Sequence, residues 1–271
     1  MGPVEFSKYH GLGNDFVIVE GSAGQISEGE VRKICHRRRG VGADGLIAVR
    51  LVERQPVCRV EMVIFNRDGS RPQMCGNGVR CVAAWAQRRW GGEDEIIVET
   101  DAGTRRCRIV AHQDSRWEVA VDMGRTAVDA TESPLRVGGD QFDFVRVDVG
   151  NPHAVIFAQV DVDTVDRVGA RANDDHRRFP EGVNVEFTQQ GDHGFETVVY
   201  ERGVGRTQAC GTGACAVAAA AWATGRVDED QTIGVQLPGG RLEIEQREDR
   251  ITMTGEAVEV FSGRWGGSNG S

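Results

Sequence analysis

Two cysteines of this chain stand in the same local sequence and could carry protons. Cys75 and Cys210 each begin a Cys-Gly-x-Gly turn that leads into an Ala- and Val-rich stretch. A thiol at the start of a helix lies among unpaired backbone N–H groups, at the positive end of the helix dipole, which favours the thiolate over the thiol. We therefore expect both cysteines to act as acids, bases or nucleophiles near neutral pH.

The two Cys loops are copies of one sequence device. Asn66 precedes Cys75 by nine positions, and Glu201 precedes Cys210 by the same nine. In each copy the polar residue ends an apolar, strand-like run and a Gly-containing loop follows. This internal repeat predicts two pseudo-symmetric domains, with one thiol on each side of a shared cleft.

Three chemistries use a thiol in this position, and they differ in how many Cys loops they need. Redox chemistry is disfavoured because the C-x-x-C motif is absent. An acyl-transfer nucleophile could take His153 as its base and the turn amides as its oxyanion hole, but one loop would be idle. Proton transfer at a carbon uses both loops, because one thiolate removes an α-proton and the other thiol delivers a proton to the opposite face. His153 and Glu201 could then each tune one thiol.

Composition narrows the class of partner. The 271 residues carry a formal charge of −9, with a pI of about 5.3, which argues against nucleic acid and a membrane surface. No apolar run reaches the ~18 residues of a membrane span, and the N-terminus lacks a signal-peptide core. The seven cysteines predict reduced thiols, and their spacing does not fit a zinc site. We expect a soluble, cytoplasmic protein without a metal.

Hydrophobic periodicity predicts the elements that position these residues. In the first half it predicts helices over 28–38 and 76–90 and strands over 4–9, 16–19, 56–65, 95–100, 104–112 and 117–122. In the second half it predicts helices over 162–168 and 211–224 and strands over 144–149, 154–157, 184–187, 197–201, 233–236, 240–246, 250–254 and 258–261. Asn14 and Asn151 follow matching Gly-containing turns in the two halves.

One stretch invites a nucleotide-binding interpretation. Residues 40–45 fit the pattern G-x-G-x-x-G, which binds dinucleotides only when a strand precedes it and a helix follows it. Here a predicted helix precedes it and an apolar, strand-like run follows. We therefore expect no nucleotide at this loop.

The predicted fold class is α+β, with each domain a mixed β-sheet or barrel wrapped around a central Ala-rich α-helix. The first domain covers residues 1–121 and also includes a C-terminal strand at about 256–264. The second covers 122–255. The Gly- and Ser-rich segment 265–271 is expected to be a disordered tail.

These motifs closely resemble the diaminopimelate epimerase family. The matching segments run in the same order over nearly the whole chain, at 11–16, 66–70, 74–81, 150–155, 182–185, 201–205 and 209–213. The resemblance implies a cofactor-independent isomerase with the active site between its two domains. It would convert LL-diaminopimelate to meso-diaminopimelate, on the route to lysine and peptidoglycan.

The resemblance also implies a role for each site residue. Cys75 and Cys210 would be the two acid/base residues, and His153 and Glu201 would modulate the thiols. The backbone amides of the two turns would bind the carboxylate of the reacting centre, at Gly76, Asn77, Gly211 and Thr212. The remaining contacts to the substrate would come from Asn14, Asn66, Asn151, Asn184, Glu201 and Arg202. Arg202 would hold the non-reacting end by its carboxylate.

Two positions depart from the family pattern. Gly45 stands where some members carry Gln near the substrate, and Arg206 stands where many have Glu. Two other functions stay open, namely a related racemase of the same fold acting on proline, hydroxyproline or an aromatic acid, and a non-catalytic module that binds amino acids. The sequence also leaves open which thiol serves which stereoisomer and whether the chain forms a homodimer.

Overall fold

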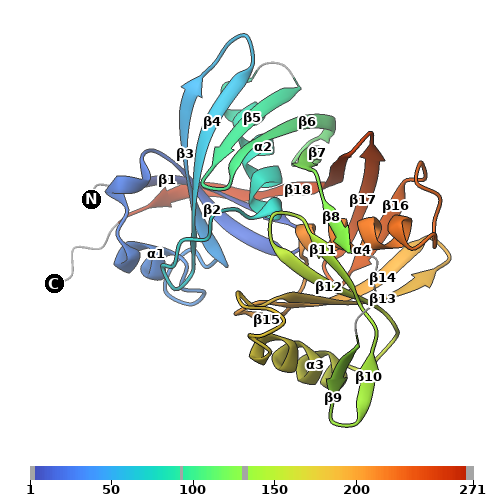
Figure 1. Ribbon diagram of the computed structural model, residues 1–271. Coiled ribbons are helices and arrows are strands. Elements are labelled where there is room, and N and C mark those ends of the chain that lie inside the picture. Colours follow the sequence, from blue (N-terminus) through green and yellow to red (C-terminus); the bar gives the residue numbers. More distant parts are fainter. Residues whose placement is uncertain (1–3, 92–93, 130–133, 267–271) are drawn as a thin grey trace. The chain divides into compact units, whose positions relative to one another are not determined.

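The computed structural model describes residues 4–91, 94–129 and 134–266. The chain divides into two compact units: unit 1 is Met1–Val121 with Gly255–Ser271, and unit 2 is Asp122–Thr254. Both units consist mainly of β-strands with few helices, which confirms the predicted α+β class (Figure 1).

The sheet of unit 1 closes on itself. Its strands are β1 (Val4–Gly11), β2 (Asn14–Glu20), β3 (Gly45–Glu53), β4 (Cys58–Asn66), β5 (Glu95–Thr100), β6 (Gly103–Gln113), β7 (Arg116–Gly124) and β18 (Arg250–Trp265). They are hydrogen-bonded in that order, and β1 also pairs with β18, so the strands form a barrel. Thr254 and the residues before it on β18 belong to unit 2.

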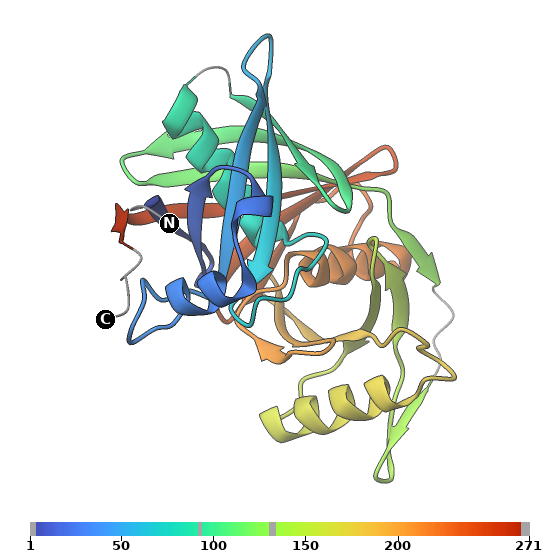
Figure 2. The ribbon, with the colours of Figure 1, turned by 90° about the vertical axis from the view of Figure 1, so that its left-hand side faces the viewer.

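Helix α2 (Gly76–Trp90) lies inside the strands of unit 1, as Figures 1 and 2 show. It packs against β1, β2, β4, β5 and β6, and every residue from Gly76 to Ala86 is buried. A helix enclosed by a sheet must be small or apolar on all sides, which explains its Ala- and Val-rich sequence. Its bounds are those predicted from the sequence.

Helix α1 (Glu28–Ile34) is shorter than the predicted 28–38. Ser27 and Glu30 form the expected capping box at its start. The helix ends early because the chain turns back at Gly40, where a Cβ would lie 2.2 Å from the Lys33 carbonyl oxygen. The Gly42 N–H then donates to the Ile34 carbonyl oxygen at 3.0 Å. One short 3₁₀ helix, η1 (Ala23–Gln25), precedes α1.

Unit 2 repeats this plan with additions. Its strands are β8 (Ala127–Asp129), β9 (Leu135–Val137), β10 (Asp140–Phe142), β11 (Val145–Asp148), β12 (Pro152–Phe157), β13 (Asn184–Gly191), β14 (Gly194–Glu201), β15 (Gly205–Thr207), β16 (Ile233–Leu237) and β17 (Gly240–Arg247). The strand order is β8-β11-β12-β13-β14-β16-β17-β18, β15 pairs with β14, and β9 and β10 form a separate hairpin. Helix α4 (Gly211–Ala223) packs against β8, β11 to β14, β16 and β17, and α3 (Val162–Asp174) packs against β9, β13, β14 and β15.

The two units share one pattern of strand pairing. Strands β1 to β6 pair alternately antiparallel and parallel, and β11 to β14, β16 and β17 follow the same alternation. The register also matches, because Phe16 faces Gly45 in unit 1 and His153 faces Asn184 in unit 2. Residues that occupy the same place in the two units are called equivalent below.

The C-terminal part of the chain differs from the prediction. The sequence predicts separate strands over 250–254 and 258–261, but β18 is one continuous strand. Its first part, up to Thr254, pairs with β17, and its later part, from Val258, pairs with β1. Trp265 was expected to begin a disordered tail, yet it pairs with Val4 and packs against the apolar core of unit 1. Residues 267–271 of that expected tail lie outside the described residues.

An ion-paired aspartate in unit 1 should make its stability depend on acid pH. Asp15 is buried, with Lys8 at 2.9 Å and Arg37 at 2.8 Å from its carboxylate. Burial alone would raise the pKa of Asp15, but the hydrogen bonds from Arg37 and Lys8 lower it to about 2. Because the folded pKa lies below the unfolded value of about 3.9, this stabilisation is complete above that value and is lost as the pH falls through about 2.

We therefore expect Asp15→Asn to reduce the free energy of unfolding at pH 7 by about 2 kcal/mol. Urea titrations at pH 7 and at pH 2.5 measure this, and the difference between wild type and variant should shrink at the lower pH. The control is Asp101→Asn, which removes an exposed pair with Arg71 and should change stability little. An equal loss at both pH values would show that the ion pairs of Asp15 are not the cause.

Candidate active site

The first Cys loop lies in unit 1. Cys75 is the N-cap of α2 and is partly buried. Its thiol donates to Asn14 Oδ1 over an Sγ–O distance of 3.7 Å, and Asn77 Nδ2 donates to the same oxygen at 3.3 Å. The structure therefore brings together three residues that the sequence predicts for the site.

Asp44 sets the orientation of Asn14. Asn14 Nδ2 donates to Asp44 Oδ2 at 3.1 Å, and the backbone N–H of Asp15 donates to the same oxygen at 3.3 Å. Because a carboxylate only accepts, the amide nitrogen of Asn14 faces Asp44 and Oδ1 is left for Cys75. Asp44 is not among the predicted site residues, although it is the one charged residue in the Gly-rich stretch 40–45, which was the available signal.

Arg80 and Asn66 are two further polar residues near the first Cys loop. Arg80 is fully buried and donates to Asn77 Oδ1 at 2.8 Å and to the Glu256 carbonyl oxygen at 3.2 Å, so it fixes Asn77. Asn66, the last residue of β4, donates to Ser70 Oγ at 2.9 Å. Its predicted contact with a substrate stays a prediction.

The backbone of β4 explains why this chain has glycine at position 45, where some members of the family have Gln. A Cβ at this position would lie 2.6 Å from the Phe65 carbonyl oxygen, closer than any ordinary contact. Gly45 begins β3 and faces Asn66 across the ladder. A longer side chain here would require a shift of β4, so this chain is built around glycine at that position.

The second Cys loop lies in unit 2. Cys210 is the N-cap of α4, and its Sγ accepts from the Gly213 N–H at 3.4 Å, which confirms the predicted cap. Thr212 Oγ1 lies 3.5 Å from the same sulfur. The side chain of Cys210 is buried.

The ionisation of Cys210 differs from the prediction. Burial raises the pKa of Cys210 well above its usual value, the charges of Glu201 and Glu186 raise it further, and the bonds from Thr212 and Gly213 lower it only in part. A helix N-terminus contributes at most ~2 kcal/mol toward the thiolate, which does not offset burial beside two carboxylates. At Cys210 the stabilisation of the thiolate by the helix end is therefore outweighed, and the pKa of the thiol is raised.

His153 connects a buried carboxylate to the second Cys loop. Its Nδ1 lies 2.7 Å from Glu186 Oε1, and its Nε2 lies 3.0 Å from Asn151 Oδ1. Asn151 Nδ2 donates in turn to Thr212 Oγ1 at 3.4 Å. Sequence reasoning missed Glu186, although a charged residue inside the apolar run 183–187 was the available signal.

Glu201 belongs to the same set of groups. Burial raises its pKa, the hydrogen bond from Thr207 lowers it, and the charge of Glu186 raises it while that of His153 lowers it. Both residues expected to modulate the thiols, His153 and Glu201, thus lie in unit 2 with Cys210. That each of them tunes one of the two thiols stays a prediction.

Asn184 and Arg202 are joined through the backbone. Asn184 Oδ1 accepts from the Arg202 N–H at 2.9 Å, and Asn184 Nδ2 donates to the Pro152 carbonyl oxygen at 3.2 Å. The Arg202 guanidinium donates to the Glu181 carbonyl oxygen at 2.8 Å and lies 4.0 Å from the exposed Glu181 carboxylate, and the Arg202 side chain is 39% exposed. A guanidinium has five N–H donors, so most of this group remains able to bind a carboxylate.

The departure at Arg206 is accounted for by an ion pair. Arg206 Nε donates to Asp166 Oδ1 of α3 at 2.7 Å. Its charge is therefore balanced by Asp166 on the surface of unit 2.

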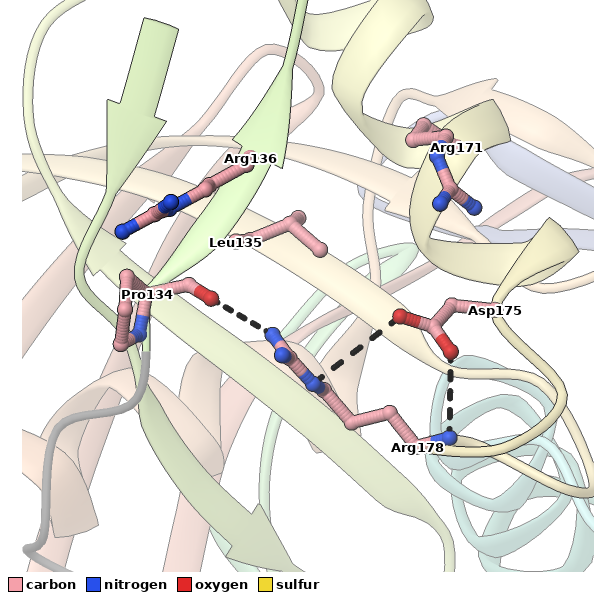
Figure 3. Close-up of a pocket in the computed structure, with 6 residues that line it drawn as sticks. All are labelled: Pro134, Leu135, Arg136, Arg171, Asp175 and Arg178. Carbon is pink, nitrogen blue, oxygen red and sulfur yellow. Dashed lines mark hydrogen bonds and ion pairs between the residues drawn. The ribbon is translucent and has the colours of Figure 1, made fainter.

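A hollow of about 350 Å³ in unit 2 contains none of the predicted site residues (Figure 3). Its lining is Pro134, Leu135, Arg136, Arg171, Asp175 and Arg178. Arg178 Nη1 donates to the Pro134 carbonyl oxygen at 2.7 Å, and its Nε lies 4.0 Å from the Asp175 carboxylate. Arg178 therefore ties the β9 side of the hollow to the chain after α3.

Within residues 4–91, 94–129 and 134–266, no group of three or more His, Cys, Asp or Glu side chains could hold a metal ion. In the same residues, no helix has the length and apolar character needed to cross a membrane.

Comparisons with known proteins identify relatives over nearly the whole chain. The family model described as diaminopimelate epimerase matches residues 6–128 and 145–260. A diaminopimelate epimerase of Desulforudis audaxviator is 43% identical over 281 residues, covering 97% of this chain and 99% of that protein. One of Moorella thermoacetica is 40% identical over 280 residues, covering 96% and 98%.

Solved structures share the fold at low identity. A phenazine biosynthesis protein of the PhzF family from Bacillus anthracis has a TM-score of 0.72 at 16% identity, covering 98% of this chain and 99% of that one. A hydroxyproline epimerase from Agrobacterium vitis has a TM-score of 0.71 at 15% identity, covering 98% and 94%. At such identities the likeness speaks for the fold alone.

Proposed function

The chain belongs to the diaminopimelate epimerase family, and from that premise we propose that it converts LL-diaminopimelate to meso-diaminopimelate without a cofactor. The observation that carries the mechanism is the pair of equivalent thiols. Cys75 and Cys210 cap equivalent helices; Cys75 donates to Asn14 Oδ1, and burial beside two carboxylates raises the pKa of Cys210. Inversion of a stereocentre needs two groups in different protonation states, so Cys75 must lose its proton before turnover in the direction described next.

In the direction that starts with Cys210 protonated, the Cys75 thiolate takes the α-proton and the α-carbon–hydrogen bond breaks. Cys210 then gives its proton to the opposite face of that carbon, so that Cys75 ends as a thiol and Cys210 as a thiolate. The reverse direction exchanges the two roles. Because the α-proton is far less acidic than a thiol of pKa about 8.5, the intermediate needs stabilisation. The N–H groups that begin α2 and α4 would provide it by binding the substrate carboxylate.

We further propose that the enzyme works in the cytoplasm, on the route to lysine and peptidoglycan. All seven cysteines are thiols rather than disulfides, which suits a reducing compartment. A formal charge of −9 suits a small-molecule substrate better than a nucleic acid.

Exchange of the α-proton in D₂O tests the proposed function. We expect wild-type protein to convert LL-diaminopimelate to the meso isomer with loss of the α-proton signal in ¹H NMR. With two separate acid/base groups, deuterium should appear in the product before it appears in the remaining substrate.

The control substrates are L-lysine, L-proline and trans-4-hydroxy-L-proline at the same concentration. Exchange on proline or hydroxyproline but not on diaminopimelate would assign the chain to a different substrate. No exchange on any of them would leave a protein that binds without catalysis.

A further inference from the structure

Unit 2 buries an ionisable pair where unit 1 is apolar. The matching register makes Phe16 the equivalent of His153 and Ile47 the equivalent of Glu186. Phe16 is 3% exposed and Ile47, His153 and Glu186 are 0% exposed. Unit 1 therefore shows that this plan of strands can fill both places with hydrocarbon, and packing alone does not require the pair.

The second member of each pair lies under the first turn of the central helix. A Cβ added at Gly78 of α2 would lie 3.2 Å from Ile47 Cδ1, and one at Gly213 of α4 would lie 2.9 Å from Glu186 Oε1. The same point at Gly213 is 3.3 Å from Cys210 Sγ. The absence of a side chain at Gly213 thus lets the carboxylate and the sulfur approach one helix end together.

Burying His153 and Glu186 together costs free energy. Replacing a buried ion pair by apolar residues of similar volume is often neutral or stabilises a protein by about 1–4 kcal/mol. In the part of the chain that the structure describes, Glu186 Oε2 is also buried without a hydrogen-bond partner, which costs about 1–3 kcal/mol. Stability therefore does not explain why a carboxylate occupies this place.

The hydrogen bonds of His153 show what the carboxylate does. Both ring nitrogens face acceptors, Glu186 Oε1 at 2.7 Å and Asn151 Oδ1 at 3.0 Å. Asn151 keeps this orientation because its Nδ2 donates to Thr212. Glu186 therefore fixes the ring of His153 through Nδ1, and Asn151 fixes it through Nε2.

We propose that Glu186 is a positioning residue of the second Cys loop, which holds His153 through Nδ1 and whose negative charge keeps the Cys210 sulfur protonated. This inference rests on the proposed function, because it assigns Glu186 a part in the same reaction. Glu186 interacts with three titratable groups from the elements around it: His153 of β12, Glu201 of β14 and Cys210 at the start of α4. Its charge acts to raise the pKa of both Cys210 and Glu201, after the larger effect of burial.

Glu186→Gln tests the proposal because it keeps the shape of the side chain and removes its charge. Without that charge the Cys210 thiolate forms more readily, so iodoacetamide should alkylate Cys210 about tenfold faster at pH 7.5, and the pH profile should move about one unit lower. Mass spectrometry with fragmentation reads this site separately from Cys215. The kcat for diaminopimelate should fall by about 10- to 100-fold, less than the ~10²–10⁴-fold contributed by an acid or base itself.

The matched control is Glu196→Gln on neighbouring β14, where the carboxylate is exposed and accepts from Gln189 at 2.7 Å. It should leave the alkylation profile and kcat as in wild type. A Glu186→Gln profile that coincides with wild type would overturn the proposal and leave Glu186 a structural residue.

A second variant, His153→Phe with Glu186→Ile, replaces both residues by the types that occupy the equivalent positions in unit 1. It should fold with a Tm at or above that of wild type and show the same faster alkylation of Cys210. A variant that fails to fold, or one that alkylates as wild type does, counts against the proposal. Alkylation needs no substrate, so if wild type fails to epimerise diaminopimelate the proposed function falls while the role of Glu186 is still decided.

Discussion

Replacing either Cys75 or Cys210 by alanine should lower the rate of epimerisation of LL-diaminopimelate by at least about 10³-fold, within the range contributed by a general acid or base. In the proposed mechanism every turnover uses one thiol to remove a proton and the other to supply one, so neither variant should keep useful activity. Chromatographic separation of the LL and meso isomers measures the rate. Circular dichroism should show an intact fold, because an N-cap change costs only about 0.5–2 kcal/mol.

Each active-site thiol has a matched control in its own helix. Cys81 lies in α2 and Cys215 in α4, and both are buried. Alanine at either position should reduce stability modestly and leave the rate near that of wild type. If Cys75→Ala or Cys210→Ala turned over substrate as fast as these controls, the two-thiol mechanism would be wrong.

Arg202→Met should lower kcat/KM for LL-diaminopimelate by about 10²-fold or more, because the far carboxylate positions the α-carbon between acid and base. Both kcat and KM should worsen, since a substrate held at one end only is misaligned as well as weakly bound. Wild type should act on L-lysine very slowly, because lysine lacks the second carboxylate. Steady-state kinetics on both substrates measures these effects.

Arg206→Met is the matched control for Arg202, because Arg206 lies four positions further along the chain, in β15. Its guanidinium is engaged with Asp166 of α3, so its loss should leave kcat/KM close to wild type. Equal effects of the two substitutions, or equal wild-type rates on lysine and diaminopimelate, would remove Arg202 from the substrate site.

Local signals made the two central helices predictable. A Cys-Gly-x-Gly turn marks the start of each helix, and Gly91 and Gly225 follow their ends. Helix α2 therefore has the predicted bounds, and α4 ends one residue before the predicted position. The fold class followed from the same repeat, because two copies of one strand and helix order must be covered in the same way.

The ionic environment of the site could not be predicted, because it depends on contacts between distant strands. Asp44 is 30 residues from Asn14, and Glu186 is 33 residues from His153. Burial beside such partners, rather than the helix end, decides the ionisation of Cys210. Short strands were missed for a different reason, since the three residues of β9, β10 or β15 are too few to show a period.

The continuous strand β18 has a consequence for how the protein is made. A ribosome releases β1 to β7 first, but the barrel of unit 1 has no strand to join β7 to β1 until β18 emerges. Unit 2 is contiguous from Asp122 to Thr254, so all of its residues leave the ribosome before the last strand of unit 1 is complete. Folding during synthesis therefore finishes the later unit first, while the earlier one waits with two open edges that invite pairing with other chains.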